Sequence, residues 1–170
     1  MADLNLSMPY VLQNEGGYTV DDGGPTNFGI VEQDLATYRG IPVSTITAED
    51  IKNLTVAEAT AIYAKEYWQP MGLSAVNDQS IATAIFDAGV NMGIGTGARL
   101  AQRVVGATGD GIIGPNTLLA INTWTRANFI PPFANAVLTH YQGIVASDPG
   151  KYSRYFPGWS ARAKRLLTLA

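Results

Sequence analysis

Residues 14–30 read NEGGYTVDDGGPTNFGI, and this stretch separates an N-terminal helix from the rest of the chain. Asp3 is a suitable N-cap for a helix that runs through about Asn14. Gly16-Gly17 ends this helix, because glycine readily takes the left-handed conformation that follows a last turn. The residues after it alternate β-prone pieces with turn formers. They predict a small β-hairpin or looped β element over residues 18–30.

The rest of the chain has the apolar spacing of helices. Residues 78–92 place four apolar side chains on one stripe, which is typical of a core helix. Capping-box patterns, Thr47-x-x-Asp50 and Thr55-x-x-Glu58, start two helices, and the second should run until Pro70. Further helices are expected near 96–105, 116–125, 132–146 and 158–169, and Pro131-Pro132 should start the third of these. In the first helix, Pro9 leaves open a later start at Ser7.

These elements predict a mainly α, single-domain helical fold with a small β-hairpin after the first helix. The length of 170 residues and the 46% content of hydrophobic residues suffice for one buried core. Residues 1–76 hold 10 acidic and 3 basic residues, whereas residues 77–170 hold 4 acidic and 8 basic residues. The formal net charge of −3 is therefore an average over an acidic and a basic half.

The residue counts exclude several kinds of catalytic site. The chain has no cysteine, which rules out disulfides, thiolate nucleophiles and cysteine metal ligands. His140 is the single histidine, so sites that need two imidazoles are excluded. A Ser-His-Asp triad would have to use His140, and the sequence has no G-x-S-x-G motif to supply the serine. We therefore expect no metal and no cofactor. Carboxylate chemistry is what remains for hydrolysis at neutral pH.

Glu15 is the best candidate for a general acid. It falls at the C-terminal end of the first predicted helix, where the helix dipole places a partial negative charge. This charge disfavours the ionised carboxylate, so we expect a raised pKa for Glu15, as a general acid needs. Asp21 or Asp22 can supply the second carboxylate of a glycosidase pair, and Thr26 can position a water molecule. The alternative is that these acids only form turns, since Asp side chains in glycine-rich loops commonly bond nearby backbone N–H groups.

Five blocks of sequence, in a fixed order, extend over nearly the whole chain. Together they resemble the glycoside hydrolase family 108 muramidases, a lysozyme-like family made up mostly of phage and prophage endolysins. The blocks are EGGY (15–18) with DDGGPTNFGI (21–30), IYAKEYW (62–68), FDAGVNMG (86–93), DGIIGPNT (110–117) and FPGWSAR (156–162).

The resemblance assigns roles to the candidate carboxylates. It implies that Glu15 is the catalytic acid, and Asp21 and Thr26 match the family's D-x-G-G-x-T pattern. The spacer of five residues between Glu15 and Asp21 is shorter than in the family pattern, and Asp22 stands where proline is usual. Asp22 therefore stays as an alternative second carboxylate.

Other residues are expected to contact the substrate. Two interpretations stay open for most of them, because aromatic residues at helical spacing are more often core, and a carboxylate and an amide four residues apart on a helix can also bond a loop. Besides Asp22, the expected substrate-binding residues are Tyr18, Asn27, Tyr67, Asp87 and Asn91, with Tyr63 and Trp68 as further members of an aromatic wall.

The resemblance also suggests a division of the chain. Residues 1–76 are expected to form a catalytic muramidase region, and residues 77–170 a helical region like the predicted peptidoglycan-binding regions of the family, the two packed as one domain. For DGIIGPNT itself we favour the simpler interpretation of a turn between helices, with Pro115 at a helix start.

The leading hypothesis is an endolysin that hydrolyses the β-1,4 bond between N-acetylmuramic acid and N-acetylglucosamine. A lytic transglycosylase, which needs only one acid/base carboxylate, and a non-catalytic wall-binding protein are the rivals. The expected partner is the peptidoglycan glycan strand, with no nucleic acid, and the protein is expected to be a monomer. Since the N-terminal residues have no basic and apolar signal pattern, we expect synthesis in the host cytoplasm and action on the periplasmic wall after holin-type release.

The last twenty residues carry five basic side chains and no acid. Helical spacing of Trp159, Arg162, Ala163, Leu166 and Leu167 leaves two interpretations. This segment either packs on the domain as a closing helix, which we favour, or makes a weak contact with the anionic wall or outer membrane as an amphipathic element.

Overall fold

The computed structural model describes residues 1–21 and 23–170, except for the side chain of Asp21. Most of these residues are helical, and the sheet consists of two short antiparallel strands. The elements are α1 (Leu4–Glu15), β1 (Thr19–Asp21), β2 (Gly24–Thr26), α2 (Glu32–Arg39), α3 (Ala48–Lys52), α4 (Val56–Tyr63), α5 (Gln79–Met92), α6 (Ile94–Val105), α7 (Pro115–Ile121), α8 (Arg126–Ser147), α9 (Pro149–Tyr152) and α10 (Phe156–Arg165). The mainly α fold with a hairpin after the first helix is therefore confirmed.

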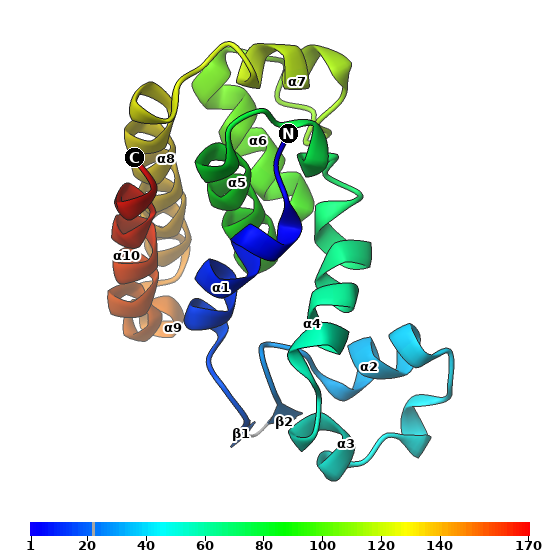
Figure 1. Ribbon diagram of the computed structural model, residues 1–170. Helices are drawn as coiled ribbons and strands as arrows, with labels where there is room; N and C mark the ends of the chain where they lie inside the picture. Colours follow the sequence, from blue (N-terminus) through cyan, green and yellow to red (C-terminus); the bar gives the residue numbers. More distant parts are fainter. Residues whose placement is uncertain (22) are drawn as a thin grey trace.

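Two lobes of unequal size make up the molecule (Figure 1). The larger lobe holds α1 and α5–α10, and the smaller lobe holds the hairpin with α2 and α3. Helix α4 runs from one lobe to the other. Helix α1 ends at Glu15, where the chain leaves the larger lobe for the hairpin.

Helix α1 begins where its cap predicts. The Asp3 side chain accepts a hydrogen bond from the backbone N–H of Asn5, and the helix runs through Pro9 without a break. Met8 and Val11 are buried against the core, which offsets the hydrogen bond that proline cannot donate. The alternative start at Ser7 is wrong, because Ser7 lies within the helix and its hydroxyl bonds Thr83 of α5.

A second turn follows the hairpin. Strands β1 and β2 pair Thr19 with Thr26, and the backbones of Asn27 and Ile30 then exchange two hydrogen bonds. Both residues between them have positive φ, 52° at Phe28 and 75° at Gly29. A two-residue turn with this geometry suits glycine, so Phe28 is a strained position.

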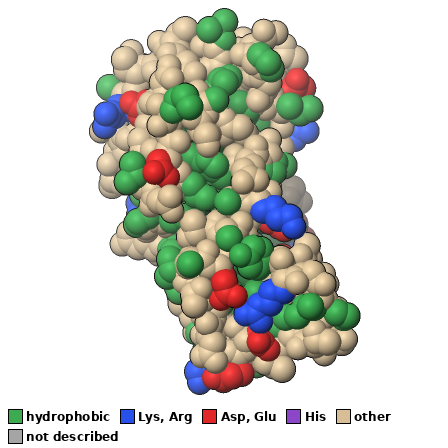
Figure 2. Space-filling view, turned by 45° about the vertical axis from the view of Figure 1, so that its right-hand side comes forward, with side chains coloured by type: hydrophobic (Ala, Val, Ile, Leu, Met, Phe, Trp, Pro, Cys, Tyr) green, Lys and Arg blue, Asp and Glu red, His purple; other side chains and the backbone are tan. Residues whose placement is uncertain are grey.

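The two capping boxes of the smaller lobe are confirmed. Thr47 and Thr55 each accept from the backbone N–H three residues on, and the carboxylates of Asp50 and Glu58 bond back to the caps. Arg39 at the end of α2 pairs with both carboxylates, at 3.0 Å each, and so ties α2 to the starts of α3 and α4. Figure 2 shows acidic and basic side chains side by side on this lobe.

The helix that begins at Val56 changes geometry before Pro70. Its α-helical part ends at Tyr63, and Ala64–Trp68 forms a π-helical turn. Tyr63 and Trp68 are buried, and each ring packs edge-on against Phe86 of α5. These two aromatic residues belong to the core rather than to a wall for sugar rings.

Helix α5 is the centre of the larger lobe. Every residue from Ile81 to Gly89 is buried, and α5 packs against α1, α6 and α8. Its stripe of apolar residues was predicted from the sequence over 78–92, and Asp78 caps it as the residue before Gln79. The only charged side chain in this buried run is that of Asp87.

The expected start of a helix at Pro131-Pro132 is wrong. Helix α8 begins at Arg126, and both prolines lie inside it. Phe129, Ile130 and Phe133 are fully buried around the prolines, and this burial stabilises the turn that lacks two backbone donors.

The C-terminal segment closes the larger lobe. Helix α10 lies along α8 (Figure 1), and Ala163 and Leu166 face the core. The favoured interpretation of the basic tail as a packed helix is therefore confirmed, whereas Leu167 stays exposed.

Candidate active site

Glu15 occupies the last position of α1, next to the hairpin. Its side chain is 19% exposed, so it is accessible from solvent yet largely enclosed. The Oε1 atom accepts a hydrogen bond from Nη2 of Arg162 at 2.8 Å. The ion pair joins the first helix to α10, the last one, across 147 residues of sequence.

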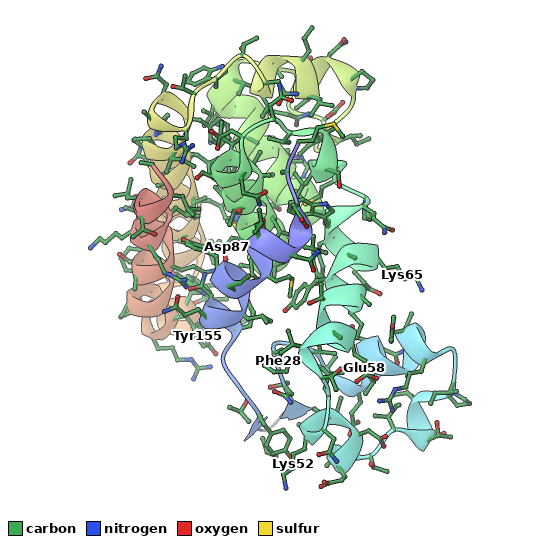
Figure 3. The ribbon with its side chains drawn as sticks, viewed as in Figure 1. Phe28, Lys52, Glu58, Lys65, Asp87 and Tyr155 are labelled. Carbon is green, nitrogen blue, oxygen red and sulfur yellow. The ribbon has the colours of Figure 1, made fainter. Side chains whose placement is uncertain are left out.

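Arg162 is shared between Glu15 and Asp87. Its Nη2 also donates to Oδ1 of Asp87 at 2.9 Å, and its Nε donates to Oδ2 at 3.1 Å. Asp87 is only 2% exposed and lies between α1, α5 and α10 (Figure 3). Burial opposes the charge on Arg162, but the two carboxylates outweigh it and raise the pKa of Arg162 above its usual value.

Neutral side chains of α1 complete this network. The amide nitrogen of Asn14 donates to Oδ1 of Asp87 at 2.8 Å, while its oxygen accepts from Arg165. Arg165 also donates to the side-chain oxygen of Gln13, and its guanidinium lies over the ring of Tyr10. Two arginines of α10 are thus held against the end of α1.

The strained turn lies directly beside Glu15. The hydroxyl of Tyr63, the last residue of α4, donates to the backbone oxygen of Phe28 at 2.8 Å. Figure 3 shows Phe28 beside α4. A Cβ added at Gly29 would lie 2.8 Å from that hydroxyl and 2.9 Å from Oε2 of Glu15. Burial, and then the charge of Glu15, raise the pKa of Tyr63, so the hydroxyl keeps its proton. The close approach of Glu15 to this turn requires glycine at position 29.

The other expected catalytic residues are only partly placed. Asp22 and the side chain of Asp21 lie outside the described residues, so their roles stay predictions. Thr26 is half-buried in β2, and its hydroxyl bonds the hydroxyl of Thr19 at 2.9 Å. In the described part of the chain no hydrogen bond joins Thr26 to Glu15, and its catalytic role is untested.

Two expected substrate contacts have internal partners instead. Asn27 is 5% exposed, and its amide nitrogen donates to the backbone oxygens of Ile51 and Lys52, so it holds the hairpin on α3. Asp87 is buried under Arg162 and acts on the site only through that arginine. The geometry gives both residues a positioning role, because neither presents a surface that a sugar can contact.

Three further candidates remain accessible. Tyr18 is 38% exposed at the start of the hairpin, and Asn91 is exposed near the end of α5, where it accepts from the hydroxyl of Tyr141 at 2.6 Å. Tyr67 is half-buried in the π-helical turn, with its ring 5.7 Å from that of Tyr63. Burial, followed by the charge of Asp34, raises the pKa of Tyr67. Contact of these residues with substrate stays a prediction.

Arg162 is the site residue that the sequence analysis missed. It appeared there only as the last residue of the FPGWSAR block and as part of a basic tail. The available signal was the buried Asp87, because a carboxylate on so apolar a helix needs a cation. The spacing of the basic residues does not indicate which of them pairs with Asp87. Residues on both sides of the expected division at residue 76 build this network, and the division itself stays a prediction.

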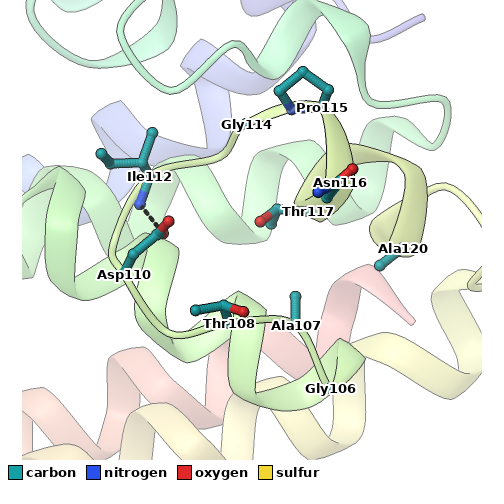
Figure 4. Close-up of a pocket in the computed structure, with 10 residues that line it drawn as sticks. All are labelled: Gly106, Ala107, Thr108, Asp110, Ile112, Gly114, Pro115, Asn116, Thr117 and Ala120. Carbon is teal, nitrogen blue, oxygen red and sulfur yellow. Dashed lines mark hydrogen bonds between the residues drawn. The ribbon is translucent and has the colours of Figure 1, made fainter.

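A separate pocket of about 530 Å³ lies at the loop between α6 and α7 (Figure 4). The Asp110 side chain accepts from the amide of Gln102 and the backbone N–H of Ile112, and these bonds hold its pKa below the usual value. Gln102 also donates to Thr117, and Pro115 is the first residue of α7. DGIIGPNT is thus a turn between helices, as favoured from the sequence.

The described residues contain no group of three or more His, Asp or Glu side chains arranged to hold a metal ion. Within the same residues, none of the helices has the length and apolarity needed to cross a membrane.

Comparisons with known proteins identify the family of the chain and a solved structure of similar fold. The sequence model of the family described as Glycosyl hydrolase 108 matches residues 8–93. These residues include Glu15, the hairpin, Tyr63 and Asp87. The solved structure of Brucella abortus SagA is similar over 97% of this chain and 91% of its own, with 29% sequence identity and a TM-score of 0.78. A comparison with curated proteins finds no match.

Proposed function

Since the chain belongs to glycosyl hydrolase family 108, and is therefore a glycoside hydrolase, we propose that it is a muramidase. Its substrate in this proposal is peptidoglycan, and the bond it hydrolyses is the β-1,4 bond between N-acetylmuramic acid and N-acetylglucosamine. The five sequence blocks that resemble the muramidases of this family support the choice of substrate.

The observation that carries the proposal is the placement of Glu15. A general acid must be reachable by the glycosidic oxygen and held in one orientation. Glu15 is partly exposed at a helix end and is oriented by Arg162. Asp21 or Asp22, in the hairpin that follows, supplies the second carboxylate in this proposal.

The biological role in the same proposal is that of an endolysin. The protein is made in the host cytoplasm and reaches the periplasmic wall after a holin-type lesion has opened the membrane. The expected result is lysis of Gram-negative cells from outside only after their outer membrane has been permeabilised. Lysis of untreated cells at the same rate contradicts this route.

Glu15→Gln tests the catalytic assignment. General acid catalysis contributes about 10²–10⁴-fold, so we expect the variant to lose at least about 100-fold of the rate on purified peptidoglycan while its melting temperature stays close to that of the unchanged protein. The matched control is Glu49→Gln, which removes an exposed carboxylate paired only with Lys52 and Asn53 and should leave the rate unchanged.

The product masses separate the proposal from its rivals. A hydrolase leaves a free reducing end on the muramic acid, whereas a lytic transglycosylase leaves the anhydro form. Mass spectrometry of the soluble fragments should show the hydrated product. Anhydro products assign the transglycosylase reaction, and sedimentation with sacculi without any released fragment assigns a binding protein.

A further inference from the structure

A pocket of about 370 Å³, lined by two arginines and three amide side chains, opens beside the Glu15–Arg162 ion pair. Its walls come from the last turn of α1, the end of α5 and the part of α10 between Gly158 and Arg165. Figure 3 shows this region at the lower end of the larger lobe, on the side of Tyr155. The lining residues are Gln13, Asn14, Asn91, Gly158, Trp159, Ala161, Arg162 and Arg165.

The pocket is lined by two guanidinium groups. Arg162 is paired with Glu15 and Asp87, as described above. Arg165 bonds only the neutral side-chain oxygens of Gln13 and Asn14 and stacks over Tyr10. Among the described residues, no carboxylate lies within salt-bridge distance of Arg165. These contacts fix its position, while its charge has no partner of opposite sign among the side chains that the structure describes.

Two of the three amide side chains that line the pocket, those of Gln13 and Asn91, have nitrogens without a described partner, whereas the nitrogen of Asn14 donates to Asp87. The side-chain oxygens of Gln13 and Asn14 accept from Arg165, and that of Asn91 accepts from Tyr141. The amide nitrogens of Gln13 and Asn91 donate to no described protein group, and neither does Nη1 of Arg162. An unpaired guanidinium surrounded by free N–H donors fits a ligand that only accepts hydrogen bonds, which a carboxylate does.

In the proposed reaction, the net charge beside this pocket becomes more positive when Glu15 is protonated. When Glu15 holds the proton that it donates to the glycosidic oxygen, Arg162 keeps only Asp87 as a charged partner. Asp87, which pairs with Arg162 and not with Arg165, is then the one described carboxylate left in this network, and the two arginines leave one excess positive charge. A carboxylate brought by the substrate restores neutrality at the moment when the acid is protonated.

We propose that this pocket is a substrate subsite that binds a carboxylate carried by the muramic acid residue, with Arg165 as its main contact. This inference rests on the proposed muramidase function and adds which part of the glycan is recognised. The carboxylate comes either from the lactyl group of a peptide-free muramic acid or from the stem peptide attached to it. A neutral glycan of N-acetylglucosamine alone lacks this group and makes no such contact.

Equilibrium binding of cleavage products tests the subsite without requiring turnover. The probes are the disaccharide N-acetylglucosaminyl-N-acetylmuramic acid, the same disaccharide with its stem peptide, and both compounds with their carboxylates converted to amides. Isothermal titration calorimetry on the unchanged protein should show at least one free carboxylate form binding about tenfold tighter than its amide. The two carboxylate forms show whether the lactyl group or the stem peptide is the source.

Arg165→Gln should abolish this preference and leave the affinity for the amides unchanged. The matched control is Lys164→Gln, which removes the same charge one residue away, where Lys164 borders a different, apolar groove between α8 and α10. Arg165→Lys keeps the charge but not the planar fork and should retain part of the preference. Thermal melting of each variant separates a loss of binding from a loss of fold.

Equal binding of the carboxylate and amide forms, no binding of any probe, or a preference that survives Arg165→Gln overturns the subsite. Failure of the proposed function has a different signature. In that case, the unchanged protein releases no reducing ends from peptidoglycan, whatever the calorimetry shows.

Discussion

At the scale of single residues, one guanidinium organises the site. Arg162 lies between an accessible carboxylate, Glu15, and a buried one, Asp87. The buried carboxylate fixes the orientation of the arginine, and the arginine fixes that of the acid. The arrangement costs desolvation energy, and a buried ion pair is by itself weak evidence for stability. We therefore infer that the network of Arg162, Glu15 and Asp87 serves to position Glu15.

Arg162→Met should destabilise the protein by about 3–5 kcal/mol, because it leaves the charge of Asp87 buried with only the amide of Asn14 as a side-chain partner. The double variant Arg162→Met with Asp87→Asn removes both charges and should recover at least half of that loss, yet stay inactive. Urea denaturation measures the stability, and reducing-end release measures the activity. Equal instability of the single and double variants would falsify the explanation by an unpaired charge.

Gly29→Ala tests the contact between the turn and the acid. Alanine at the φ of 75° costs about 1 kcal/mol in backbone energy, and its Cβ would also displace Tyr63 or Glu15. Gly40→Ala is the control, since Gly40 has a φ of 68° and open space around it. We expect both variants to lose stability but only Gly29→Ala to lose activity, by about tenfold or more. Similar activity in both contradicts a tight fit around Glu15.

At the scale of elements, the sequence predicts correctly those helix starts and turns that depend on neighbouring residues. The N-cap of α1, both capping boxes and the hairpin all depend on residues a few positions apart. The predicted start of α8 is wrong, because Pro131 and Pro132 are only a local start signal. The burial of Phe129 and Phe133 overrides that signal, and it depends on distant parts of the chain. The π-helical turn at Ala64–Trp68 likewise has no sequence signal of its own.

The ion pairs of Arg39 with Asp50 and Glu58 should make the stability of the smaller lobe depend on pH. Hydrogen bonds from Thr47 and from Arg39 lower the pKa of Asp50, and those from Thr55 and Arg39 lower the pKa of Glu58. A carboxyl group whose pKa is lower in the folded state stabilises the fold above its unfolded value of about 4, and this contribution is lost as the pH falls through the folded value.

Arg39→Gln should therefore lower the melting temperature by only about 2–4 °C at pH 7, since exposed ion pairs contribute little to stability. The gap between the variant and the unchanged protein should shrink as the pH is lowered below about 4, because both carboxylates then lose their charge. Differential scanning calorimetry at pH 7 and pH 3 measures it. A gap that stays constant or widens in acid shows that Arg39 acts through packing instead.

At the scale of the whole molecule, the candidate site joins the two ends of the sequence. The sequence predicted Glu15 and its position at a helix end, because helix signals are local. It did not predict that Arg162 and Arg165 reach α1, because that contact depends on how α10 packs on α8. The same packing turns Asp87 from an expected substrate contact into a buried support. The residue types of the site were readable from the sequence, and the pairs that they form were not.

The packing of α10 leads to a prediction for the whole chain. Deleting residues 159–170 removes Arg162 together with the buried Ala163 and Leu166. The loss of the charged partner of Asp87 and the uncovered apolar face of α8 should then cost more than the roughly 5–15 kcal/mol of stability that a domain has, so we expect loss of the near-ultraviolet circular dichroism signal and aggregation. Lys164→Glu reverses an exposed charge on the same helix and should keep the fold and the activity. A truncated protein that stays folded but no longer sediments with sacculi would instead make this segment a wall-contacting surface, because its basic residues would then act on the partner and not on Glu15 and Asp87.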